Sequence, residues 1–333
     1  MRLFKAKPYI IAEVGSNFRS LEDCILSISK AKACGADAVK FQHFGVQDLY
    51  GPRLDWEQPV PLPKIPTMWL PQLKEKADAV GIDLMCTAFS PRGVAAVDPY
   101  VSAHKVASSE LTYPQQLEAV KACGKPILMS VGASSKYDIQ QAMGVLRGGP
   151  QVCLLYCVAA YPARMSNLFF LEDLKQFGVP IGLSDHSREV VYPPLSAVRH
   201  FGAVVVEKHV NFVGATDTPD APHSLNETEF KLMCDYLHGV RDADDFQPMP
   251  EEKEMFLRHN RRLLATRPIA VGESLAFGVN YGCYRSPTDE TQGSHGMTWE
   301  LFEGQPAKQP IAAGEGIYAQ NVQMKQQKIQ RVV

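Results

Sequence analysis

The sequence predicts a (β/α)8 barrel followed by a small C-terminal unit rich in short strands. Between Tyr9 and about Val240, short β-branched apolar runs alternate with amphipathic stretches, and almost every amphipathic stretch ends at a glycine. This alternation is typical of repeated βα units, in which helices connect parallel strands. About eight units follow one another, and eight strands is the number that closes a barrel.

The apolar runs mark the expected strands, and the amphipathic stretches mark the helices. Strands are expected at Tyr9–Gly15, Ala38–Gln42, Asp83–Ala88, Lys105–Ser108, Ile127–Ser130, Cys153–Cys157, Ile181–Ser184 and Val204–Lys208. Helices are expected around Leu21–Cys34, Met68–Val80, Arg92–Asp98, Pro114–Cys123, Lys136–Arg147, Leu168–Phe177, Val190–His200 and Glu227–Val240. Left-handed caps are expected at the glycines that follow five of these helices, Gly35, Gly81, Gly124, Gly178 and Gly202. A doubly wound open sheet is the alternative fold, but the segment EVGSN after the first strand is not its glycine-rich phosphate turn.

The character of the chain changes after the last βα unit. We assign residues 1–243 to the barrel, 244–261 to a charged, proline-containing linker and 262–333 to a separate small unit. That unit contains an internal echo, IAVGESL at Ile269–Leu275 and IAAGEGI at Ile311–Ile317. We expect the two copies to form similar strand-turn-strand pieces that fold against each other, with a chance repeat as the alternative.

Charge and composition exclude several classes of protein. The chain has 34 Lys+Arg and 36 Asp+Glu, a net charge of −2, so it has no global positive field for nucleic acid or an anionic membrane. The first apolar stretch is interrupted at Glu13, too early for a signal peptide, and no window approaches the length of a membrane span. The 8 cysteines form no CxxC pair, so we expect buried, reduced thiols in a cytoplasmic protein.

Polar side chains gather where the expected strands end, and that end of a barrel is where active sites lie. They are Glu13, Ser16, Asn17, Lys40, Gln42, His43, Thr87, Ser90, Lys105, Ser108, Ser109, Glu110, Ser130, Tyr161, Ser184, Asp185, His186, Glu207 and His209. Burying unpaired ionisable groups is costly, so a polar pocket inside the ring explains them best. Side-chain alternation predicts shared faces for Lys40 with Gln42, Ser108 with Glu110, Ser184 with His186, and Glu207 with His209.

His186 and His209 stand at the ends of neighbouring expected strands. Their imidazoles could meet at one point, an arrangement that suits a divalent cation completed by water and a carboxylate. A single histidine more often satisfies a local hydrogen bond. Two on adjacent strand ends, beside Asp185, Glu207 and Glu13, favour a metal site.

Lys40 and Lys105 are expected to form an anion cradle with the hydroxyls of Thr87, Ser108 and Ser130. One alternative is that each lysine pairs with a nearby glutamate as an ion pair inside the barrel. Another is that one lysine forms a Schiff base, as in barrel aldolases. The histidine pair argues against the Schiff base, because that chemistry needs no metal.

Nine segments resemble, in order and spacing, the N-acetylneuraminate (sialic acid) synthase family, which includes legionaminate and pseudaminate synthases. They are IAEVGSN, GADAVKFQ, CTAFS, KVASSEL, GKPILMSVGASS, YCVAAYPA, IGLSDHS, VVEKHV and PDAPHSL. The C-terminal unit resembles the small antifreeze-like (SAF) domain of those enzymes. The resemblance therefore covers essentially the whole chain.

The resemblance implies a transferase that condenses phosphoenolpyruvate with an N-acetylmannosamine-like sugar and releases phosphate by C–O cleavage. It implies that a divalent metal, Mn²⁺ or Mg²⁺, on His186 and His209 would polarise the aldehyde, and that Glu110 handles the attacking water. The positions that match phosphoenolpyruvate ligands are Lys40, Lys105, Thr87, Ser108 and Ser130. Sugar-side positions are matched by Glu13, Gln42, Tyr161 and Asp220, and we expect Ser184 to bind substrate as well. Besides Glu110, we expect Glu13, Lys40 and Lys105 to act in catalysis.

Arg285 resembles an arginine that the small domain delivers into a neighbouring subunit's site, which implies a domain-swapped homodimer. Two departures from the family pattern, at Phe18 to Ser20 and at Ala159, are expected near the sugar and leave its identity open. The alternatives are a 3-deoxy-octulosonate or heptulosonate synthase, a Schiff-base aldolase, and a non-catalytic sugar-binding relative.

Overall fold

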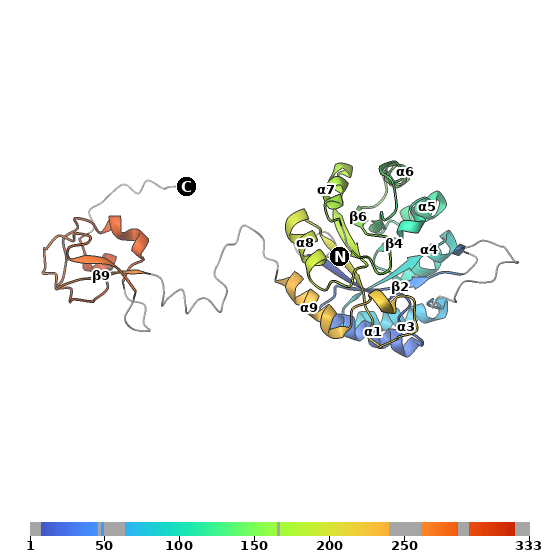
Figure 1. Ribbon diagram of the computed structural model, residues 1–333, viewed down its shortest axis with the longest axis horizontal. Coiled ribbons are helices and arrows are strands. Elements are labelled where there is room, and N and C mark those ends of the chain that lie inside the picture. The colour runs from blue at the N-terminus through green and yellow to red at the C-terminus, as the bar shows by residue number, and fades with distance from the viewer. Residues whose placement is uncertain are drawn as a thin grey trace. The chain divides into compact units, whose positions relative to one another are not determined.

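The protein folds into two compact units, Met1–Asp242 and Ala243–Val333. The computed structural model describes residues 8–45, 48–49, 64–164, 167–239, 261–285 and 293–323. In the first unit eight parallel strands close into a barrel in the order β1 to β8, with helices around the outside (Figure 1). This confirms the predicted (β/α)8 barrel and excludes the doubly wound sheet.

Every expected strand and helix of the barrel is present, with ends shifted by a few residues. The strands are β1 (Tyr9–Glu13), β2 (Ala38–His43), β3 (Asp83–Ala88), β4 (His104–Val106), β5 (Ile127–Ser130), β6 (Val152–Tyr156), β7 (Ile181–Asp185) and β8 (Val205–His209). The helices are α1 (Leu21–Ala33), α3 (Leu70–Val80), α4 (Pro91–Val97), α5 (Pro114–Ala122), α6 (Lys136–Leu146), α7 (Phe170–Leu174), α8 (Tyr192–Phe201) and α9 (Glu227–His238). Short 3-10 helices are η1 (Thr67–Trp69), η2 (Asp98–Tyr100), η3 (Ser108–Glu110), η4 (Lys175–Phe177) and η5 (Ala221–His223). Among the described residues, no helix is both long and apolar enough to cross a bilayer.

Local sequence signals set the helix ends. At the start of α9, the Asn226 side chain accepts from the backbone N–H of Glu229, whose carboxylate accepts from the N–H of Asn226. This reciprocal capping box satisfies two backbone donors that the helix itself cannot. The five predicted cap glycines, Gly35, Gly81, Gly124, Gly178 and Gly202, all have positive φ, between +67° and +97°.

The fourth strand ends earlier than predicted. The pairing of β4 with β5 stops at Val106, and the chain then turns into η3. The backbone N–H of Glu110 donates to the carbonyl of Ala107, as a 3-10 turn requires. The prediction that Ser108 and Glu110 share a strand face was therefore wrong, because residues two apart in a 3-10 helix point in different directions.

The barrel interior is layered, and this layering positions the site. An apolar cluster fills the amino-terminal half of the barrel: Tyr9, Ile11, Ala38, Met85, Ala103, Leu128, Cys153, Leu155 and Val205. Two residues further along the same strands, the inward positions become Glu13, Lys40, Thr87, Lys105, Ser130 and Glu207. Strand alternation keeps both sets on one face, so the polar layer lies on an apolar floor.

The second unit contains a two-stranded antiparallel sheet, β9 (Arg262–Ala265) and β10 (Tyr281–Tyr284), with the 3-10 helices η7 (Gly296–Leu301) and η8 (Ala319–Asn321). The backbones of Ile269 and Ile311 exchange both hydrogen bonds, at 2.9 and 3.0 Å. In each copy of the echo a glutamate carboxylate accepts from a backbone N–H three residues earlier, Glu273 from Ala270 and Glu315 from Ala312. The echo is therefore a repeated turn whose two copies pair with each other as expected, but they do so through an isolated bridge and do not form the predicted strand-turn-strand pieces. Most of the predicted linker, 244–260, lies outside the described residues.

Candidate active site

A cavity of about 720 Å³ opens at the carboxyl ends of the strands. It is lined by twelve of the residues predicted to act in catalysis, substrate binding or metal binding: Glu13, Lys40, Gln42, Thr87, Lys105, Ser108, Ser130, Tyr161, Ser184, His186, His209 and Asp220. Glu110 is half-buried in η3 and is not among the lining residues. Arg285 lies in the second unit, just after β10, and is exposed.

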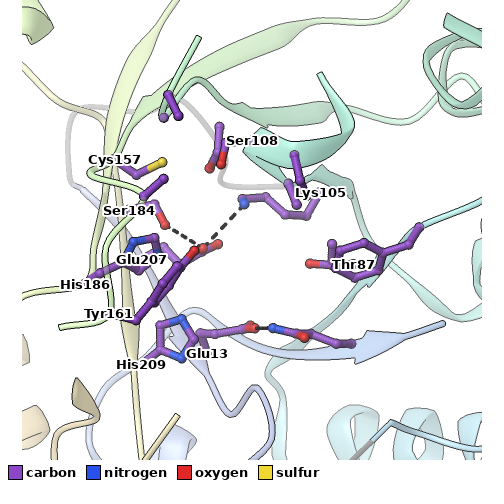
Figure 2. Close-up of a pocket in the computed structure, with 18 of the residues that line it drawn as sticks. Glu13, Thr87, Lys105, Ser108, Cys157, Tyr161, Ser184, His186, Glu207 and His209 are labelled. Atoms are coloured by element: carbon purple, nitrogen blue, oxygen red, sulfur yellow. Dashed lines mark hydrogen bonds and ion pairs between the residues drawn. The ribbon is translucent and has the colours of Figure 1, made fainter. Parts of the chain in front are cut away.

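A network of charged side chains lies at the bottom of the cavity. Lys40 Nζ is 2.8 Å from Glu13 Oε2 and 3.5 Å from Glu207 Oε2. Lys105 Nζ is 3.5 Å from Glu207 Oε1, which also accepts a hydrogen bond from Ser184 Oγ at 2.8 Å. Figure 2 shows Glu207 between Lys105 and Ser184. The ion pairs that were one alternative for the two lysines are therefore present, in the same cavity as the hydroxyls of the predicted anion cradle.

The buried charges of this network shift one another's pKa values. Burial raises the pKa of Glu207, but the ammoniums of Lys105 and Lys40 outweigh it and bring that pKa down to about 2. Burial also lowers the pKa of the Lys105 ammonium, an effect that Glu207 opposes only in part. Two lysines and two glutamates nearly cancel in charge, so an incoming anion depends on local contacts with ammonium and hydroxyl groups.

Unpartnered polar groups mark where a ligand would bind. The hydroxyl of Ser130 is buried and has no hydrogen-bond partner among the described residues. Thr87 Oγ1 accepts from Lys40 Nζ at 2.9 Å, which leaves the Thr87 hydrogen available to donate. Beside them, Ala133 lines the cavity with φ +55°, a conformation that is unusual for a residue other than glycine and often found at functional sites.

The structure brings His186 and His209 together, with ring centroids 5.5 Å apart (Figure 2). His186 Nδ1 lies 2.7 Å from the carbonyl oxygen of Val158, so that nitrogen carries the proton and Nε2 keeps its lone pair. Burial lowers the pKa of both imidazoles to about 4, and at His209 the Asp220 carboxylate opposes this shift only in part. Neutral imidazoles are the form that binds metals, so the donor set fits a divalent cation.

Asp185 does not lie beside this pair, and that expectation was wrong. Its carboxylate is 2.5 Å from Lys208 Nζ, and it also accepts from the hydroxyl and N–H of Ser187 at 3.0 Å. Strand alternation explains the result, because Ser184 and His186 point inward and the residue between them must point outward.

Phe18 likewise does not lie near the sugar side. It is buried, and its ring packs edge-to-face against Phe41 and Trp69, with centroids 6.4 and 6.3 Å away. The change from the family pattern at Phe18 therefore affects the hydrophobic core between the barrel and its helices. Ala159, the other departure, does line the cavity.

Sequence reasoning did not single out several polar contributors to the site. Thr112, Ser134, Asp138 and Cys157 line the cavity, and His223 lies beside it in η5. Ligand atoms of His209, Asp220 and His223 all lie within 4.8 Å of one another. The only signal in the sequence was an extra histidine in PDAPHSL, a loop without periodicity from which no direction can be read.

The comparisons with known proteins agree with this geometry. The profile of the NeuB family matches residues 27–246. An uncharacterized protein of Methanocaldococcus jannaschii is 32% identical over 283 residues, which cover 82% of this chain and 83% of that protein. A pseudaminic acid synthase of Campylobacter jejuni is 30% identical over 292 residues, covering 80% and 84% of the two chains.

Among solved structures, an N-acetylneuraminic acid (sialic acid) synthetase from Leptospira borgpetersenii aligns with a TM-score of 0.66 and 26% identity. The alignment covers 75% of this chain and 90% of that one. The family profile spans more than half of the sequence, and the relatives match over most of their own length. The chain belongs to the NeuB family.

Proposed function

We propose that this protein is a nonulosonic acid synthase that condenses phosphoenolpyruvate with an N-acetylmannosamine-like amino sugar. C3 of phosphoenolpyruvate attacks the open-chain aldehyde, water adds at C2, and phosphate leaves by C–O cleavage. The names of the relatives, a pseudaminic acid synthase and a sialic acid synthetase, support this class of product. The observation that carries the proposal is one cavity that holds two buried lysines and a pair of neutral imidazoles, together with a Ser130 hydroxyl that has no hydrogen-bond partner in the described part of the chain.

The lysine side of the cavity would hold phosphoenolpyruvate. Lys105 and Lys40 supply charge, and Thr87, Ser130 and Ser108 supply hydroxyl donors to the phosphate and carboxylate. Charge-assisted hydrogen bonds are strongest where water is excluded. Lys40 is 2% exposed and Lys105 is 5% exposed, so their ammonium groups meet this condition. Binding the anion would give the Lys105 ammonium a second anionic partner besides Glu207.

The histidine side would hold the sugar aldehyde. His186 and His209 would bind a divalent metal, Mn²⁺ or Mg²⁺, which when bound supplies Lewis-acid polarisation of a carbonyl oxygen. Gln42 Nε2 donates to Glu13 Oε1 at 2.8 Å, and this fixed pair can orient sugar hydroxyls. Tyr161, whose ring lies 4.4 Å from that of His186, would cover the bound sugar together with Asp220.

The reaction is tested by measuring phosphate release from phosphoenolpyruvate over a panel of hexosamines. The panel contains N-acetylmannosamine, its 6-phosphate, and deoxy diacetamido hexoses, each with and without a divalent metal. We expect release only when a suitable sugar and a metal are both present. Release that survives complete chelation would remove the metal role, and release with phosphorylated pentoses or tetroses alone would favour an octulosonate or heptulosonate synthase.

A Schiff-base aldolase has less support, because both lysine ammoniums lie within 3.5 Å of a carboxylate. Borohydride trapping of substrate on Lys40 or Lys105 would favour the aldolase. Sugar binding without turnover across the whole panel would favour a non-catalytic relative. The burial of Phe18 in the core weakens one of the two reasons for considering that possibility.

Glu110 is proposed as the general base that accepts a proton from the attacking water. Burial raises the pKa of its carboxyl, and below that pKa the group is protonated and cannot accept a proton. We therefore expect kcat/KM to fall as the pH is lowered through a value above about 4.3, the ordinary glutamate pKa. Glu110→Gln should lose most activity together with this acid limb, and an unchanged limb in that variant would assign the base elsewhere.

The second unit is proposed to be an antifreeze-like domain that delivers Arg285 to the site of a neighbouring subunit. Arg285 is exposed, as a residue reserved for such a contact would be. Arg285→Ala should raise the KM for the sugar about tenfold or more while leaving the KM for phosphoenolpyruvate unchanged, since one charge-assisted hydrogen bond contributes about 1.5–3 kcal/mol. Arg267→Ala, in the same unit, is the matched control. Equal effects on both substrates would contradict the assignment.

We place the reaction in the cytosol. All eight cysteines are free thiols, and most are buried, which is typical of a reducing compartment.

A further inference from the structure

The loop between β8 and α9 is held firmly against the start of the barrel. Asn17 Nδ2 donates to the carbonyl of Val210 at 2.9 Å and to Ser224 Oγ at 2.7 Å. Asn17 Oδ1 accepts from the hydroxyl of Thr218 at 2.5 Å. Because these contacts join residues about 200 positions apart, the side chains that the loop carries are fixed relative to the barrel.

One of those side chains, His223, has no explanation in packing alone. It is 1% exposed, and neither ring nitrogen has a hydrogen-bond partner among the described residues. Its ring centroid lies 4.5 Å from that of His209 and 5.2 Å from that of Tyr161. A buried polar ring without partners is costly, and an apolar side chain would fill the same space without that cost.

Asp220 presents one oxygen to this histidine. Its Oδ2 accepts from the N–H and the hydroxyl of Ser16 at 2.7 and 2.8 Å. Its Oδ1 lies 3.5 Å from His223 Nε2 and 4.0 Å from His209 Nδ1. In a tetrahedral site with metal–ligand bonds of about 2.0–2.2 Å, neighbouring ligand atoms lie roughly 3.3–3.6 Å apart. The ligand atoms of His209, Asp220 and His223 already lie within 4.8 Å of one another, so a modest contraction would let all three bind one cation.

We propose that His223 is a direct ligand of the divalent cation, joined by Asp220, and that these two residues extend the pair formed by His186 and His209. The ligand set would then contain three imidazoles and one carboxylate, which favours a first-row transition-metal cation such as Mn²⁺ or Co²⁺ over Mg²⁺. This inference rests on the metal site of the proposed function. It does not depend on the identity of the sugar, so it can be tested without turnover.

The first test measures Co²⁺ binding to the metal-free full-length chain, with calorimetry for the affinity and visible absorption for the coordination. His223→Gln should weaken Co²⁺ affinity at least about tenfold and alter the absorption spectrum. The matched control is His200→Gln, an exposed histidine on α8, which should bind like the wild type. Unchanged Co²⁺ affinity and spectrum in His223→Gln would overturn the inference. If His186→Ala lost Co²⁺ affinity in the same experiment, the metal site formed by His186 and His209 in the proposed function would still stand.

A ligand exchange separates direct coordination from a supporting role. His223→Cys should bind Co²⁺ and show a near-ultraviolet thiolate-to-cobalt charge-transfer band. Cys157 also lines the cavity, so the band is measured as the difference from the wild type and from His223→Gln. Circular dichroism checks that each variant is folded. Absence of the band in folded His223→Cys with Co²⁺ bound would contradict direct ligation, and a wild type that binds no Co²⁺ would refute the metal site as a whole.

Discussion

His186→Ala should lower kcat/KM by about 10³-fold or more while leaving the protein folded. Loss of an imidazole that is proposed to bind the metal would remove several kcal/mol of stabilisation of developing charge, and each 1.36 kcal/mol is a factor of about ten in rate. The structural cost is small, because the side chain contributes one hydrogen bond, to the carbonyl of Val158, worth about 0.5–1.5 kcal/mol.

The measurement is initial-rate phosphate release at saturating metal, paired with thermal unfolding of the same preparations. His200→Ala on α8 should match the wild type in both assays, since His200 is exposed on the outer helix. Wild-type activity in His186→Ala would show that this residue is not part of the metal site.

Lys40→Met should destabilise the fold by about 3–5 kcal/mol and abolish activity. Lys40 is 2% exposed and contacts both Glu13 and Glu207, so its loss leaves two buried carboxylates with less compensation. Replacing a whole buried ion pair by apolar residues often leaves the free energy of unfolding nearly unchanged. Removing only one partner is strongly destabilising, because the other charge stays buried without compensation. The same change also removes a charge proposed to bind phosphoenolpyruvate.

Urea unfolding at pH 7 measures this effect. The matched control is Lys74→Met, which breaks a shorter but exposed ion pair with Asp78 on α3 and should cost less than about 1 kcal/mol. The double variant Lys40→Met with Glu13→Gln should recover part of the stability, because one uncompensated charge is removed. If Lys40→Met lowered the free energy of unfolding no more than Lys74→Met does, water or a structural rearrangement would be compensating the carboxylates of Glu13 and Glu207.

Sequence reasoning located most of the cavity because two simple periodicities act together. The side chains of Lys40 and Gln42, or of Glu207 and His209, lie on one face of a strand whatever surrounds them. The same rule, applied strictly, would have excluded Asp185, which points to Lys208. Where the local conformation changed, at η3, the rule failed for Ser108 and Glu110.

The sequence by itself determined the succession of strands, helices and glycine caps, because those depend on side-chain periodicity and backbone preferences within a few residues. Only the tertiary structure decided that Phe18 joins the core and that Asp220 and His223 reach His209. These placements depend on contacts such as Ser16 with Asp220 and Asn17 with Ser224, between residues that are distant in the chain. Loops have no repeat from which a direction can be read, so closure of the barrel is what brings such residues together.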